Sequence, residues 1–76
     1  MLVPVIMNAT VREVHEGRLL VTDRSSGQEV IVHTANPCRF CPGDEVRIRY
    51  SGIMTMSLPP QISAIWISRI RPSCGC

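Results

Sequence analysis

The stretch EVRIRY at residues 45–50 gives the clearest indication of the fold, because apolar and charged side chains alternate along it without interruption. Successive side chains of a β-strand point to opposite faces, so strict alternation separates a buried face from a solvated one. We therefore expect a strand here, with Val46, Ile48 and Tyr50 pointing into a core and the charged residues between them facing solvent.

Other segments on both sides of this stretch are also rich in β-branched residues and are bounded by turn residues, which predicts further strands. They span residues 5–15, 19–23, 29–34 and 61–70. In the first of them the apolar phase slips after Val11, which predicts a β-bulge near Arg12 or Glu13. The last is apolar on both faces, so we expect it to be central or covered, with Trp66 in the core beside Tyr50.

The segments between the strands carry turn and loop signals. CPGD at residues 41–44 predicts a tight turn with Pro42 and Gly43 at its two central positions. Residues 51–60, SGIMTMSLPP, form a long connection in which Pro59 and Pro60 favour a stiff, extended backbone.

The pattern predicts an all-β protein with little or no helix, because no window shows a convincing helical period. Short strands with turns about every 10 residues favour a small five-stranded Greek-key barrel of the OB-fold type, and an SH3-like barrel is the alternative. A chain of 76 residues is long enough for one such domain, which we expect to span residues 1–76.

Residues 50–67, YSGIMTMSLPPQISAIWI, resemble the signature Gly-x-Ile/Met-x-x-Ser-x-Pro-x-Gln-x-x-Ala of a poorly characterised bacterial family of small OB-like β-barrel domains. The matching residues are Gly52, Ser57, Pro59, Gln61 and Ala64. The preceding PGDEVRIRY resembles that family's entry into its fourth strand. The resemblance implies an OB-like barrel and no particular activity. Many members follow a secretory or lipoprotein signal, and the cysteines are not part of the signature.

The N-terminal stretch MLVPVIM is apolar but carries a proline and no basic flank. It is too short for a signal peptide or a membrane span, so we expect a cytoplasmic protein that does not enter a membrane. The formal net charge of +2 is only weakly basic, although all eight basic residues are arginine. Charge alone therefore does not indicate a polyanionic partner.

The four cysteines form two short pairs, C-x-x-C at Cys38 and Cys41 and C-x-C at Cys74 and Cys76. Two chelating pairs on separate segments can supply the four thiolates of a structural Zn²⁺ site. The first pair precedes the strand at 45–50 and the second follows the last strand, so antiparallel neighbours would bring them to one end of the barrel. A zinc site, one or two disulfides, and free thiols are the three interpretations.

No pattern in the sequence points to catalysis, and we expect a non-catalytic binding or interaction module with an unidentified protein or small ligand as partner. The predicted contact residues are Met54, Met56, Pro59 and Pro60, where the methionines either cap the barrel or form an adaptable apolar surface. The alternative is a single-stranded oligonucleotide-binding barrel that uses Arg18, Arg24, Arg47 and Arg49. An exposed strand edge would also allow a homo-oligomer.

Overall fold

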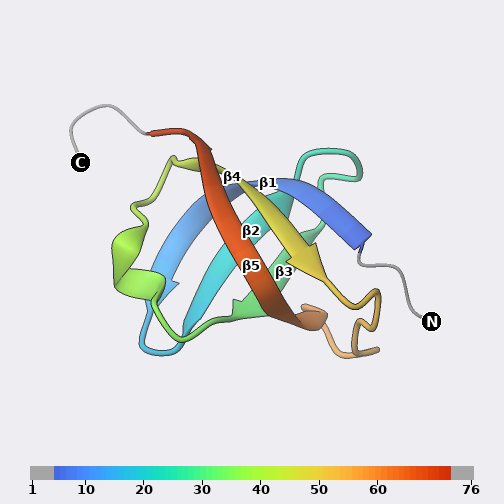
Figure 1. Cartoon of the computed structure of the whole chain (residues 1–76). Helices are drawn as coiled ribbons and strands as arrows, with labels where there is room; N and C mark the ends of the chain where they lie inside the picture. Colours follow the sequence, from blue (N-terminus) through green and yellow to red (C-terminus); the bar gives the residue numbers. More distant parts are fainter. Residues whose placement is uncertain (1–4, 73–76) are drawn as a thin grey trace.

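Five strands and one short 3-10 helix make up the part of the chain that the structure, a computed structural model, describes, residues 5–72 (Figure 1). The elements are β1 (Val5–His15), β2 (Arg18–Asp23), β3 (Glu29–His33), η1 (Pro37–Arg39), β4 (Glu45–Tyr50) and β5 (Gln61–Arg71). No helix among these residues has the length and apolar character needed to cross a membrane.

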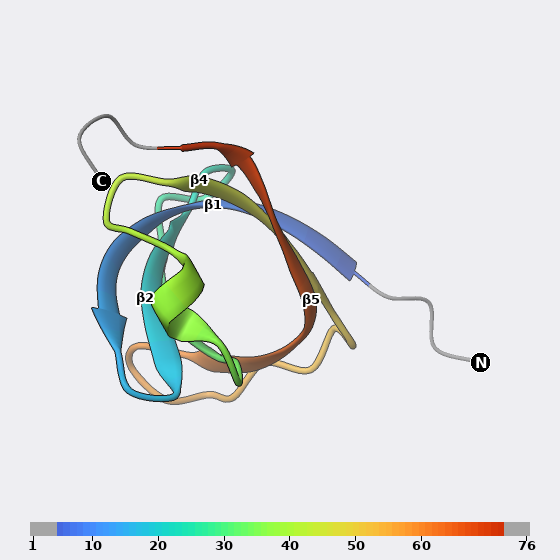
Figure 2. The same cartoon turned by 60° about the vertical axis from the view of Figure 1, so that its left-hand side comes forward.

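The strands close into a barrel in the order β1-β2-β3-β5-β4, with β4 returning to β1. Neighbouring strands are antiparallel, except that β3 and β5 run parallel. Figure 2 shows the strands as a ring, with the connection that contains η1 passing in front of it. The predicted all-β, five-stranded Greek-key barrel is confirmed.

The core is built from alternating side chains of all five strands. Val46, Ile48 and Tyr50 of β4 are buried, as the alternation of EVRIRY predicts. Burying one large apolar side chain is worth about 1.5–3 kcal/mol, so the core as a whole supplies most of the driving force for folding. The remaining core residues are Met7, Ala9, Val11, Leu19, Val21, Val30, Val32 and Ile62.

The bulge predicted near Arg12 is present in β1. Val11 lies opposite Val21 of β2, but Glu13 lies opposite Leu20, so one residue of β1 has no counterpart. Such a bulge bends a strand and increases its twist. The bend lets the first half of β1 pair with β4 and the second half pair with β2, which closes the barrel.

The predicted CPGD turn is also present, between η1 and β4. The Asp44 amide donates a 3.0 Å hydrogen bond to the Cys41 carbonyl oxygen, and Gly43 has a φ of 95° that side chains disfavour. The turn is joined to the β1 bulge, because the Gly43 amide donates to the Val11 carbonyl oxygen at 2.7 Å.

The prediction that Trp66 lies in the core is wrong, since 64% of its surface is exposed. A register shift opposite Arg49 and Tyr50 inserts one extra residue, Ile65, into β5. Ala64 faces inward, and after the shift Ile67 does so in its turn, whereas Trp66 faces outward. The second apolar face of β5 is therefore not covered by the described part of the chain.

Candidate functional site

The 51–60 connection between β4 and β5 is an ordered loop held by hydrogen bonds centred on Thr55. The Thr55 amide donates to the Gln61 carbonyl oxygen at 3.0 Å, and the Gln61 amide donates back to Thr55 Oγ1 at 2.9 Å. Ser57 Oγ lies 2.6 Å from Thr55 Oγ1 and donates to the Pro59 carbonyl oxygen at 3.0 Å. A hydroxyl has a single proton, so Thr55 must be the donor to Ser57. The result is a continuous chain of hydrogen bonds from Gln61 to Pro59.

This ordered connection turns three large apolar side chains toward solvent. Ile53 is 70% exposed, Leu58 is 92% exposed and Met56 is 98% exposed. Met54 instead packs half-buried against the core, and Pro60 is buried. The two roles considered for the methionines are thus divided between them, with Met54 covering the barrel core and Met56 standing in solvent.

The connection is anchored on the β2–β3 side of the barrel, with a hollow on each flank. The Ile31 amide of β3 donates to the Pro60 carbonyl oxygen at 2.9 Å. A hollow of about 230 Å³ is lined by Pro59, Leu20 and Ile31, and another of about 410 Å³ is lined in part by Ile53. We name the apolar contact surface as Leu20, Ile31, Ile53, Met56, Leu58 and Pro59.

The four arginines predicted to contact nucleic acid do not form a single patch. Arg18 lies on β2, which β1 separates from β4 in the barrel order. Arg24 is engaged in an ion pair with Glu45, with 3.1 Å between Nη1 and Oε2. Arg47 and Arg49 share the solvent-facing side of β4, so these two lie on one face.

Trp66 joins Arg49 on that outer face, because the two residues are directly opposite each other in the β4–β5 register. Trp66 also lines a cleft of about 230 Å³ together with Arg39 and Phe40. Sequence reasoning missed this residue, because an unbroken alternation from Ile62 would have placed Trp66 inside. Only the register shift, which the sequence does not mark, reverses its direction.

The cysteine sites are only partly within the described residues. Cys41 is disulfide-bonded, and Cys38 carries a free, exposed thiol. Cys74 and Cys76 lie outside residues 5–72. Within that range no three His, Cys, Asp or Glu side chains are grouped to hold a metal ion. A disulfide sulfur is not a thiolate ligand, so the zinc site stays a prediction for the reduced protein.

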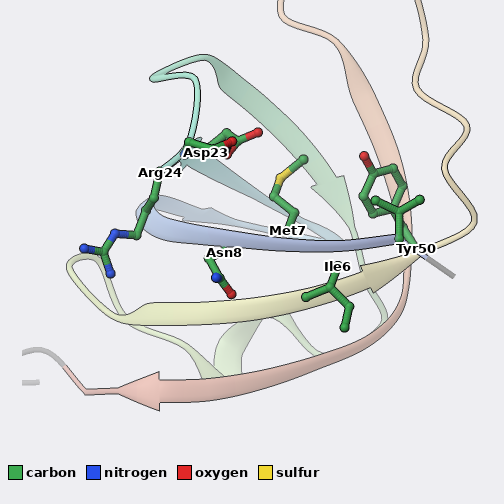
Figure 3. A pocket seen from close by; sticks show the side chains of 8 residues that line it. Ile6, Met7, Asn8, Asp23, Arg24 and Tyr50 are labelled. Carbon is green, nitrogen blue, oxygen red and sulfur yellow. Dashed lines mark hydrogen bonds between the residues drawn. The ribbon is translucent and has the colours of Figure 1, made fainter.

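A further cleft, of about 550 Å³, lies beside the start of β1, where this strand extends past β2 (Figure 3). In the figure Met7 and Ile6 point to opposite sides of β1. The acidic group here, Asp23, accepts hydrogen bonds from the amide and hydroxyl of Ser25 at 2.9 and 2.8 Å. Its carboxylate therefore organises the turn after β2.

Comparison of the chain with known protein families, with curated proteins and with solved structures finds no match. The resemblance of residues 50–67 to the OB-like family stays a prediction. Function is therefore inferred from the geometry of the surfaces described above.

Proposed function

We propose that this chain is a non-catalytic binding module that holds an apolar segment of a partner protein on the apolar contact surface. The observation that carries the proposal is the near-complete exposure of Met56 and Leu58 on a connection fixed by its own hydrogen bonds. Single exposed apolar residues are ordinary, but here three large ones lie within six residues on one short connection, and gathered apolar exposure marks an interaction site.

The construction of the connection supports recognition of a protein segment. Its backbone is already ordered by the hydrogen bonds of Thr55, so little conformational entropy would be lost on binding. Methionine is flexible and polarisable, and Met56 can adapt to side chains of different shape. The hollow beside Leu20 and Ile31 offers a recess for one apolar anchor of the partner.

The closed strand order β1-β2-β3-β5-β4 supports the interpretation as an OB-type barrel. In the OB-fold, ligands commonly contact the face of the second and third strands and the connection between the fourth and fifth. The apolar contact surface combines those same parts, namely β2, β3 and the 51–60 connection. Fold analogy alone does not assign a ligand, so the apolar character of the side chains selects the partner class.

A binding role is favoured over catalysis by the setting of the ionisable groups. His15 Nε2 lies 2.8 Å from Glu13 Oε1, but both side chains are about half exposed on the surface. His33 Nε2 contacts the Gln61 amide oxygen at 2.7 Å. Catalytic acid–base pairs are normally tuned by burial in a cleft, which neither contact provides.

The four cysteines enter the proposal as a fastening of the barrel. Cys41 opens the CPGD turn, and Cys38 is the middle residue of η1. A covalent or metal bond to either sulfur would restrain the connection between β3 and β4. We propose a disulfide under oxidising conditions and a structural Zn²⁺ when all four thiols are reduced.

Selection from a random-peptide display library tests the proposed function. We expect enriched peptides to share apolar or aromatic anchors and to lose about tenfold or more in affinity for the Met56→Ser/Leu58→Ser variant. Trp66→Ser, which removes an exposed apolar side chain from another face, is the matched control and should leave the affinity unchanged. Equal binding of the selected peptides to wild type and to Met56→Ser/Leu58→Ser would contradict the proposal.

A further inference from the structure

The outer face of β4 and β5 combines an exposed aromatic ring with arginine side chains. The two strands lie side by side in the barrel (Figure 1). Arg49 lies opposite Trp66 and Arg47 lies opposite Ser68, and cross-strand partners share one face of a sheet. Arg47, Arg49 and Trp66 are all exposed. Two strands that neighbour each other in the barrel thus present a ring flanked by positive charge.

The positive charge on this face is not neutralised by neighbouring carboxylates. Among residues 5–72, Arg39, Arg47 and Arg49 have no carboxylate within ion-pair distance. The two acidic residues that start β4 or precede it are already engaged, Asp44 with Arg69 and Glu45 with Arg24. The local field on this face is therefore positive although the net charge of the whole chain is small.

A recess that Trp66 helps to line lies between β5 and the connection that contains η1. Two adjoining hollows of about 230 and 290 Å³ are both lined by Arg39, Phe40, Trp66 and Ile67. Trp66 thus shares the recess with Arg39 and the outer sheet face with Arg49, its cross-strand partner. The aromatic side chains offer apolar faces to a planar group, and the arginines offer positive charge to negative charges attached to that group.

We infer that this face, defined by Arg39, Arg47, Arg49 and Trp66, binds single-stranded nucleic acid. Single strands are bound by aromatic side chains that stack on bases and by a positive groove that follows the phosphates. A second copy of the chain is disfavoured here, because a two-fold contact would bring these arginines against one another. The site is separate from the apolar contact surface and includes only two of the four arginines that the sequence suggested.

The chain's single tryptophan makes the inference directly measurable. Titration with mixed-sequence DNA and RNA single strands of about 12 nucleotides should quench Trp66 fluorescence saturably. The logarithm of the association constant should decrease linearly with the logarithm of the salt concentration between about 50 and 200 mM. The magnitude of this negative slope should decrease by about 0.7 for each contacting arginine that is removed. Arg49→Ala should weaken binding, and Arg18→Ala is the matched control, with the same charge loss on β2.

Fluorescence anisotropy of a labelled strand extends the test to Trp66→Leu, which lacks the intrinsic signal. Loss of one stacked base should lower the affinity by about tenfold. All substituted side chains are exposed, and circular dichroism checks that each variant is folded. The inference is overturned by absence of binding at low salt, by equal weakening in Arg18→Ala and Arg49→Ala, or by equal quenching with a polyglutamate peptide. Binding of DNA, RNA or both with the expected variant pattern supports it.

Discussion

The connections at residues 34–44 and 51–60 both lead from one strand of the barrel to another, but they are held in different ways. In the first, Asp44 is only 1% exposed, and its carboxylate accepts from Arg69 Nε at 3.0 Å and from the Cys41 amide at 2.9 Å. The Arg69 guanidinium also donates to the Arg39 carbonyl oxygen and lies 5.7 Å from the centre of the Phe40 ring.

The second connection has no such buried charge among its residues. Its order comes from the exposed hydroxyls of Thr55 and Ser57, and its large apolar side chains face solvent. Buried, charge-assisted contacts are costly to break, whereas exposed hydroxyl contacts contribute modestly because water can replace them. The 34–44 connection therefore contributes to the stability of the barrel, whereas the 51–60 connection leaves its apolar side chains exposed for the contact proposed above.

The largest effect is expected from Asp44→Ala in the first connection. This substitution leaves the partly buried Cys41 amide without its carboxylate acceptor and separates Arg69 from its acidic partner. Breaking a buried pair costs about 3–5 kcal/mol, and we expect the lower end because Arg69 is 40% exposed. Denaturant unfolding measures the loss of stability.

The neighbouring Glu45→Ala is the matched control for Asp44→Ala. Glu45 pairs with Arg24, but the Arg24 side chain is 53% exposed. A pair of this kind contributes about 1 kcal/mol or less. Equal destabilisation by the two substitutions would show that the buried contacts of Asp44 contribute no more to stability than an exposed ion pair.

The next largest effect concerns the cysteines of the same connection. Under oxidising conditions Cys41→Ser should destabilise the protein by about 2–4 kcal/mol, the usual contribution of a disulfide. Cys38→Ser should change stability little, because Cys38 is a free, exposed thiol.

Metal analysis of reduced protein then separates the zinc proposal from the disulfide. A four-thiolate site should bind one Zn²⁺ and lose it in both Cys38→Ser and Cys41→Ser. Reduced protein with freely titrating thiols and no bound zinc would exclude the metal and leave the disulfide as the fastening.

A smaller effect is expected from Thr55→Val in the second connection. The substitution keeps the shape of the side chain but removes the acceptor for the Gln61 amide and the donor to Ser57. We expect a loss of about 1 kcal/mol and faster hydrogen exchange at the Gln61 amide. Thr22→Val on β2 is the control, because valine suits a strand. Unchanged exchange at Gln61 would show that the hydroxyl chain does not order the loop.

The fold could be predicted from the sequence wherever a single local pattern determines the structure of a segment. EVRIRY alternates strictly, the phase slip after Val11 marks the β1 bulge, and CPGD suits a tight turn. Each of these features depends on local chain geometry and short-range hydrogen bonds, which neighbouring residues determine.

The candidate sites could be predicted less completely from the sequence, because they depend on contacts between segments that are distant along the chain. The register of β5 against β4 decides that Trp66 faces solvent, and the sequence of β5 is apolar on both faces. Asp44 and Arg69 are 25 residues apart, and nothing in the spacing marks them as partners. The sequence does not distinguish Met54 from Met56, and only the packed structure shows that Met54 contacts the core whereas Met56 is exposed.

The smallest effect on stability is expected from Met56→Ser, which should change the free energy of unfolding by less than about 0.5 kcal/mol, as surface substitutions usually do. Met54→Ser is the matched comparison, since it makes the same chemical change two residues away on a side chain that packs against the core. Its cost should reach about 1–3 kcal/mol, because buried methylene and thioether groups are lost. Peptide binding should show the reverse order, with the larger loss in Met56→Ser. A connection that merely covers the barrel would instead lose stability in both variants, and this pair of measurements therefore separates a cap from a contact surface.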